Sequence, residues 1–207
     1  YQLPDAGPNA RGRPVINWIA LEGGEKVQAV VPVREYEAGK FVFFATRNGT
    51  VKKTPLTEFA YRLARGKIAI NLDEGDALVN AELTDGSRDV MLFASNGKAV
   101  RFDEGAVRAM GRTATGVRGI KLAQGEEVRS LVVVDGDGDI LTASERGYGK
   151  RTPLDEYPKK GRGTQGVIAL QTTARNGKLV GAIQLSDHHE VLLISDGGTL
   201  VRTRAAE

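Results

Sequence analysis

The chain has 207 residues, of which 41% are apolar and 27% are charged, a balance typical of a folded globular protein and not of a disordered one. It contains no cysteine, which excludes disulfides, thiolate catalysis and cysteine zinc sites. The formal net charge is +3, so binding to a polyanion would require that basic residues gather on one surface. No apolar run reaches the ~18 residues of a membrane span. A chain that opens on Tyr1 without a signal peptide is expected to be part of a longer protein.

A short apolar run, a glycine turn and a basic strand recur four times along the chain, at intervals of about fifty residues. These segments occupy residues 43–54, 91–102, 140–152 and 192–203. The dipeptides Asn48-Gly49, Asn96-Gly97 and Asp196-Gly197 favour type I′ hairpin turns, because both residue types tolerate positive φ. Arg146-Gly147 indicates a different turn in the third repeat. A fixed period of this size is typical of propellers and other repeat folds.

Two further landmarks share the period. A glycine-centred stretch recurs around Gly12, Gly66, Gly116 and Gly166, and an alternating apolar run recurs at 27–33, 79–83, 128–134 and 180–185. We therefore expect four short strands in each unit. The first follows the glycine stretch, as at 68–70, and the second is the alternating strand. The third is almost wholly apolar, which predicts burial on both faces, and the fourth is basic. Residues 104–110 are the best helix candidate, weakened by Gly105.

These elements predict an all-β domain over residues 1–207, built of four-stranded blades in a propeller-like ring. The approximate repeats are 10–60, 61–110, 111–160 and 161–207. The chain begins within one unit and stops after the basic strand of another. We therefore expect the four units to be part of a larger ring.

The fourth residue after each turn glycine is basic. We expect this position to repeat a contact with DNA, because lysines and arginines held at regular intervals can follow a line of phosphates. Basic neighbours in the same strands and in the glycine stretches would extend the surface. The predicted DNA-binding set is Arg11, Arg13, Lys52, Lys53, Arg65, Lys67, Lys98, Arg101, Arg112, Arg118, Lys150, Arg151, Lys159, Lys160, Arg162, Arg202 and Arg204. The alternative is that these residues only solvate exposed edge strands.

Several motifs that suggest chemistry are interpreted as structural. Residues 161–166 fit the pattern G-x-G-x-x-G, but a β-like run follows where a dinucleotide site needs a helix. Residues 135–139 begin like a calcium loop but lack its later glycine and glutamate, so a hairpin turn is expected there. His188 and His189, the only histidines, are expected to point apart as exposed turn residues. The sequence predicts no catalytic site, no metal site and no cofactor in this chain.

The repeats resemble the C-terminal domain of the bacterial DNA gyrase A protein, in particular the proteobacterial type. The similarity covers essentially the whole chain, and its most specific stretches are residues 1–4, 48–54, 107–111, 115–119 and 147–152. The resemblance implies a six-bladed β-pinwheel whose neighbouring blades exchange strands, of which this chain is an incomplete part. It also implies that DNA bends around a basic outer rim, which lets the rest of gyrase introduce negative supercoils using ATP.

One element of the family pattern is missing. The gyrase A box, Gln-Arg-Arg-Gly-Gly-Lys-Gly, is absent, and the corresponding place in the third unit, residues 156–163, holds only a variant of it. The resemblance places a first blade upstream of Tyr1 and a last portion after Glu207. The chain is therefore expected to bind DNA while lacking the element that completes the wrap.

The resemblance implies a DNA-binding and DNA-wrapping module of a type II topoisomerase, cytoplasmic and associated with the bacterial chromosome. The expected partners are double-stranded DNA, the remainder of the gyrase A protein and the gyrase B protein, with no membrane. No tyrosine of this chain inherits DNA cleavage, because the family places that residue in another domain. Two alternatives stay open: the C-terminal domain of the topoisomerase IV A protein, and a propeller scaffold that binds protein partners.

Overall fold

The computed structural model describes residues 5–7, 9–11, 13–14, 17, 19, 21, 23–61, 63 and 66–206. Within these residues the regular secondary structure consists of β-strands and short 3-10 helices, so the all-β prediction is confirmed. No helix in this part of the chain is long and apolar enough to cross a membrane.

Four β-hairpins follow one another along the chain and form the centres of four sheets. They are β1 (Phe41–Thr46) with β2 (Thr50–Pro55), β4 (Asp89–Ala94) with β5 (Lys98–Asp103), β8 (Asp139–Ser144) with β9 (Gly149–Pro153), and β12 (Glu190–Ile194) with β13 (Leu200–Arg204). Three short 3-10 helices follow the first three hairpins: η2 (Leu56–Phe59), η3 (Glu104–Ala106) and η4 (Leu154–Glu156). We call each hairpin, with the residues directly after it, a unit, numbered first to fourth. The helix expected at 104–110 is thus a single 3-10 turn.

All four hairpins use the same turn, and it is not the predicted type I′. No described residue other than glycine has a positive φ, and Gly197 is not among the glycines that do, so the residue before each turn glycine is not in the type I′ conformation. Gly49, Gly97, Gly147 and Gly198 each have a φ near +80° and donate a backbone hydrogen bond to the carbonyl three residues earlier. This geometry is a three-residue loop that ends in a left-handed glycine. The third repeat therefore does not differ, because only its glycine needs the unusual conformation.

The first three hairpins are completed by strands from later parts of the chain. An inner strand joins one side: β3 (Leu78–Thr84) pairs with β1, β7 (Val128–Val133) with β4, and β11 (Leu179–Leu185) with β8. A two-residue outer strand joins the other side of the first two sheets, where β6 (Val117–Arg118) pairs with β2 and β10 (Val167–Ile168) with β5. The first sheet, in the order β3-β1-β2-β6, therefore spans residues 41 to 118. Neighbouring units exchange strands, as the resemblance implied.

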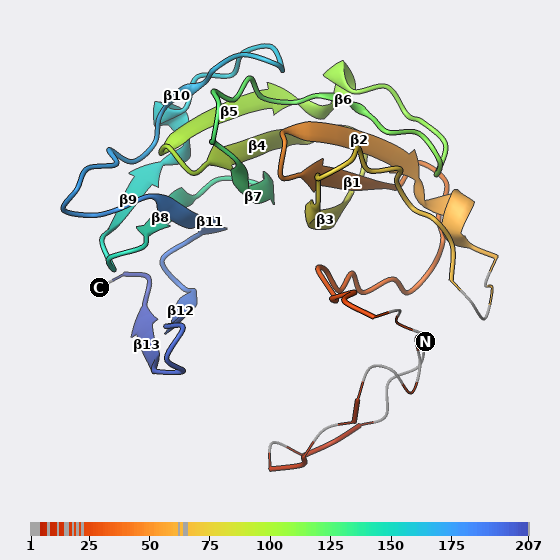
Figure 1. The fold of residues 1–207 in the computed structure, drawn as a ribbon, viewed down its shortest axis with the longest axis horizontal. Coiled ribbons are helices and arrows are strands. Elements are labelled where there is room, and N and C mark those ends of the chain that lie inside the picture. Colours follow the sequence, from red (N-terminus) through yellow and green to blue (C-terminus); the bar gives the residue numbers. More distant parts are fainter. Residues whose placement is uncertain are drawn as a thin grey trace.

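The four sheets follow one another along an arc (Figure 1). The inner strands β3, β7 and β11 lie on the concave edge, and the outer strands β6 and β10 lie on the convex edge. Strands β6 and β10 belong to the glycine stretches around Gly116 and Gly166. Those stretches therefore form the convex edge of the first and second sheets.

Two expected strands are not formed. Residues 27–33 and 68–70 have no regular secondary structure, although the equivalent segments elsewhere are inner and outer strands. An inner or outer strand pairs with the hairpin of an earlier unit, and the described residues contain no hairpin before β1. Sequence pattern alone cannot supply that partner. The single tryptophan, Trp18, for which core or inter-blade packing is the simplest expectation, lies outside the described residues.

The core consists of apolar layers between successive sheets. Strand β4 shows this arrangement clearly, because Val90 and Leu92 pack into the layer toward the first sheet while Met91 and Phe93 pack into the layer toward the third. All four side chains are completely buried. The predicted burial on both faces is confirmed for this strand, so the second unit is held by the units on either side of it. The same prediction is wrong for β12, where Leu192 and Ile194 are more than half exposed.

The turn glycine of the second hairpin provides a test of the strand exchange. A Cβ at Gly97 would lie 1.9 Å from the backbone oxygen of Leu170, and the φ of +80° would add strain. We expect Gly97→Ala to lower the free energy of unfolding by about 3 kcal/mol, measured by urea denaturation. Gly161→Ala is the control, because a Cβ there meets no atom within 4 Å and its φ lies outside the left-handed region. Equal stability of the two variants would contradict the close approach.

Candidate nucleic-acid interface

The basic position that recurs after each turn glycine is used between units. Each of the first three side chains donates a hydrogen bond to a backbone carbonyl in the next unit, at the residue three positions after that unit's own basic residue. The pairs, which we call the inter-unit contacts, are Lys53 Nζ to Glu104 O at 3.0 Å, Arg101 Nη1 to Leu154 O at 3.0 Å, and Arg151 Nη1 to Ala205 O at 2.6 Å. The repeat seen in the sequence is therefore a repeat of contacts inside the domain.

In the second, third and fourth units the residue at this position is an arginine, and it also binds an acidic residue at the start of its own hairpin. Arg101 Nε lies 2.9 Å from Asp89, Arg151 pairs with Asp139, and Arg202 Nε lies 2.9 Å from Glu190. In the first unit an aromatic ring replaces the acid, and Lys53 Nζ lies 5.1 Å from the ring centroid of Phe41. The repeated phosphate contact stays a prediction, and at this position it would compete with these contacts inside the domain. Lys53 is buried and Arg101 nearly so, and each would have to leave these partners to reach DNA.

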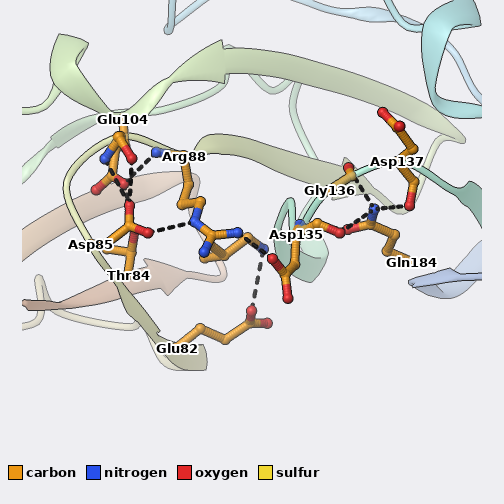
Figure 2. Close-up of polar contacts among 11 residues, drawn as sticks. Glu82, Thr84, Asp85, Arg88, Glu104, Asp135, Gly136, Asp137 and Gln184 are labelled. Atoms are coloured by element: carbon orange, nitrogen blue, oxygen red, sulfur yellow. Dashed lines mark hydrogen bonds and ion pairs between the residues drawn. The ribbon is translucent and has the colours of Figure 1, made fainter.

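Lys53 is part of a buried polar cluster around Glu104, shown in part in Figure 2. The Glu104 side chain is fully buried, and its Oε2 lies 3.5 Å from Lys53 Nζ. Its Oε1 accepts hydrogen bonds from the hydroxyl of Thr84 and, at 2.7 Å, from the backbone N–H of Arg88. The cluster joins the first unit to β3 and η3, so it is structural.

Lys52, also in the predicted DNA-binding set, is completely buried. Its Nζ donates to the backbone oxygen of Ala69 at 2.6 Å and to that of Arg112. Burial lowers the pKa of Lys52 from 10.5 to about 8, and the positive charge of Arg112 acts in the same direction. The ammonium joins two loops and is not available to DNA in this structure.

Two arginines of the glycine stretches make the same contact, one unit apart. Arg112 Nη1 donates to Ile68 O at 2.9 Å, and Arg162 Nη1 donates to Arg118 O at 3.0 Å. Arg162 Nε also donates to Ala106 O at 3.0 Å. These side chains stay at the surface, but they donate hydrogen bonds to backbone carbonyls of the preceding unit. They hold the convex edge together and keep only part of their hydrogen-bonding capacity for a ligand.

The three basic residues of the segment 156–163, which we call the box-like loop, differ in the partners that their side chains contact. Lys159 lies between two carboxylates, with Nζ 2.6 Å from Asp89 and 3.1 Å from Asp103, and these hydrogen bonds raise its pKa. Lys160 is exposed, and its side chain makes no hydrogen bond or ion pair within the described part of the chain. Of the loop's three basic residues, Lys160 is the one open to a partner.

A second polar network joins the units along another path (Figure 2). Arg88 pairs with Asp85 at 2.8 Å and with Asp135 of the loop before β8. These contacts raise the pKa of Arg88. Hydrogen bonds from Ser87 and Arg88 lower the pKa of Asp85. The Gln184 side chain accepts from the Asp135 N–H and donates to the carbonyls of residues 135–137, at 3.2 to 3.4 Å. The hairpin turn predicted at 135–139 is wrong, because the flanking strands β7 and β8 belong to different sheets, and the loop between them is closed by the Gln184 amide of β11.

The other motifs also have structural roles. Residues 161–166 lead into the short strand β10 and not into a helix. His188 and His189 do not point apart as expected: their ring centroids lie 4.5 Å apart, and both rings are within hydrogen-bonding distance of the Ser186 hydroxyl. Among the described residues, no group of three or more histidines, aspartates or glutamates is placed to hold a metal ion.

The remaining predicted residues vary in exposure. Arg11, Arg13, Arg118, Lys150, Lys160 and Arg204 are exposed, Lys67 and Lys98 are partly buried, and Arg65 lies outside the described residues. Lys67 Nζ is placed 5.4 Å from the ring centroid of Tyr61 and 3.3 Å from Glu58 O.

A basic surface remains on the convex edge after the paired residues are set aside. Arg118 lies in β6, and Lys121 follows three residues after it. Thr164 and Ile120 form a bridge that brings the loop of Lys160 and Arg162 against this segment. Arg118, Lys121, Lys160 and Arg162 are all exposed, and we call them the convex basic patch. Sequence reasoning missed Lys121, which was not counted with the basic residues of the glycine stretch around Gly116.

Comparison with known proteins identifies the domain. The family model described as "DNA gyrase C-terminal domain, beta-propeller" matches residues 1–34, 40–85, 88–135, 138–186 and 189–207. The chain belongs to this family. Three of the five segments of the gyrase C-terminal domain model, 40–85, 88–135 and 138–186, each begin at a hairpin and end after an inner strand.

Individual relatives agree with the family assignment. The DNA gyrase A protein of Salmonella typhimurium is 58% identical over the whole chain, which spans 24% of that protein. The chain thus corresponds to about a quarter of the curated relatives it matches. Among solved structures, the C-terminal domain of DNA topoisomerase IV has a TM-score of 0.88 at 30% identity, and the match covers 95% of this chain and 62% of that one. The DNA gyrase A C-terminal domain has a TM-score of 0.86 at 26% identity, covering 95% and 66%.

The lowered pKa of Lys52 makes stability depend on pH. Because its folded-state value of about 8 lies below the ordinary 10.5, the unfolded state binds more protons between these values. Stability contributed by this residue therefore rises with pH in this window, by up to about 1.4 kcal/mol per pH unit. We expect urea midpoints of the wild type to rise relative to those of Lys52→Met between pH 8 and 10. Parallel pH profiles would contradict the assignment.

The Lys53–Glu104 pair predicts strong coupling between two substitutions. Lys53→Met leaves the buried Glu104 carboxylate without its cation and should cost about 3 kcal/mol of unfolding free energy. Adding Glu104→Leu should restore most of this loss, because Leu56 and Leu154 occupy the equivalent position in two other units. A double-mutant cycle by chemical denaturation measures the coupling. Additive losses would show that the two side chains do not act as a pair.

Proposed function

We propose that this domain binds double-stranded DNA through the convex basic patch and bends it along the arc, as the wrapping module of a type II topoisomerase of the gyrase kind. The carrying observation is that Arg118, Lys121 and Lys160 are exposed on the convex edge, without an ion pair or side-chain hydrogen bond to the described parts of the domain. Such cations can release counterions from DNA on binding. Membership of the gyrase C-terminal domain family supports the same function.

The mode of binding we propose is phosphate contact without base reading. The helices among the described residues are 3-10 turns of three or four residues, too short to enter a major groove as recognition helices. Phosphate contacts position DNA without carrying sequence information. The domain would then prefer DNA sequences that bend easily, since bending DNA sharply costs on the order of several kcal/mol.

The proposed partners beyond DNA are the remainder of the gyrase A protein and the gyrase B protein, in the bacterial cytoplasm at the chromosome. ATP hydrolysis and strand cleavage would belong to those other parts. A topoisomerase IV origin is the second candidate, favoured by the TM-score of 0.88 to that enzyme's C-terminal domain. The 58% identity to a DNA gyrase A protein over the whole chain is the stronger observation, and it supports gyrase.

Matched substitutions on the two edges of the arc test this proposal. Each phosphate contact contributes about 0.9 to the slope of log affinity against log salt concentration, so Arg118→Gln with Lys160→Gln should reduce the slope by about 1.8. The control, Arg129→Gln with Lys178→Gln, removes the same two residue types at the inner strands β7 and β11. It should leave the slope unchanged.

The measurement is a binding titration with a duplex of about 40 base pairs across a salt series, followed by plasmid relaxation to detect wrapping. No binding of the wild-type chain at low salt, or equal effects of the two double variants, would refute DNA binding through the convex edge.

A further inference from the structure

The inter-unit contacts have a regular geometry that the apolar core does not require. In the second and third units, one arginine joins an acidic residue at the start of its own hairpin to a carbonyl in the next unit. Arg101 is the more buried of the two arginines. Its Nε lies 2.9 Å from Asp89, and its Nη1 donates to Leu154 O at 3.0 Å and to Tyr157 O at 3.3 Å. One planar group thus connects β4 to the η4 turn of the third unit.

These contacts are directional, whereas the layer between the same sheets is not. The side chains between the second and third sheets, such as Phe93 and Ile140, gain from burial in any well-packed orientation. A guanidinium fixed by an acid on one side and by two carbonyls on the other permits few relative orientations of the two units. The angle between successive sheets is therefore the quantity that these arginines can control.

We propose that the inter-unit contacts of Lys53, Arg101 and Arg151 set the angle between successive units, and thereby the curvature that the convex edge imposes on DNA. The three side chains are positioning residues that do not touch DNA themselves. This inference rests on the proposed function for its consequence on DNA, but the angle itself is a property of the free domain.

Arg101 is the best position for a test because shortening it removes the hydrogen bonds to Leu154 O and Tyr157 O, while the carboxylate that it binds keeps another cation. In Arg101→Gln the Asp89 carboxylate keeps its contact with Lys159, at 2.6 Å, so no unpaired charge is created. Arg101→Lys should keep part of the contact, since Lys53 shows that an ammonium can reach the equivalent carbonyl. Arg151→Gln, at a more exposed site, gives a second variant if Arg101→Gln does not fold.

Two duplexes separate positioning from binding. A duplex of about 12 base pairs is far shorter than the persistence length, so its affinity reports phosphate contacts without bending. A duplex of about 40 base pairs with a fluorophore at each end reports the bend by energy transfer. Arg118→Gln, in the convex basic patch, is the control for lost phosphate contact. Small-angle scattering of each variant without DNA reports the shape of the arc.

We expect Arg101→Gln to bind the short duplex within about twofold of wild type, with the same salt slope, and to lower the transfer change on the long duplex by about half. Arg101→Lys should lie between the two, and scattering should show an altered arc. Arg118→Gln should instead weaken binding to the short duplex and reduce the salt slope.

Other outcomes overturn specific claims. Wild-type bending and scattering in folded Arg101→Gln and Arg151→Gln would refute the role of the contacts in setting the angle. A reduced salt slope on the short duplex in Arg101→Gln would show that Arg101 binds phosphate. If the wild type does not bind DNA but scattering of Arg101→Gln is altered, the proposed function fails while control of the angle stands.

Discussion

The structure depends on one constraint: strand β4, in the middle of the second sheet, must be buried on both of its faces. Strand β4 sends Val90 and Leu92 into one layer and Met91 and Phe93 into the next, so the second sheet cannot be covered by a single neighbour. Sheets of this kind must continue on both sides. The arc, the strand exchange and the close packing of turn glycines against later segments all follow from this requirement.

Burial on both faces also determines what the charged residues do. With a sheet on either side, a basic side chain next to the apolar strand lies in the interface between units, where a desolvated charge needs partners. Arg101 finds an acid and two carbonyls, and Lys53 finds Glu104 and an aromatic ring. The cations left for a ligand are those that the repeat does not place between sheets, such as Lys121 and Lys160.

The sequence predicted the hairpins and inner strands well, because an alternating pattern and a turn glycine are local signals. The sequence-based prediction failed where a neighbouring unit determines whether a segment forms a strand. Residues 27–33 carry the inner-strand pattern but form no strand, since the described residues hold no earlier hairpin for them to join. The periodicity showed that Lys53 and Arg101 are equivalent but could not show which surface they face. Outer strands of two residues are too short to give a periodic signal.

In the described part of the chain, the fourth hairpin has neither an inner strand nor a further sheet beside it. Strands β12 and β13 form a two-stranded sheet, and Leu192, Ile194 and Val201 are each more than half exposed. Unpaired backbone groups beside apolar side chains invite a strand from another molecule. In a concentrated solution of this chain, solubility would therefore be limited at this hairpin, largely independently of how firmly the second and third sheets are folded.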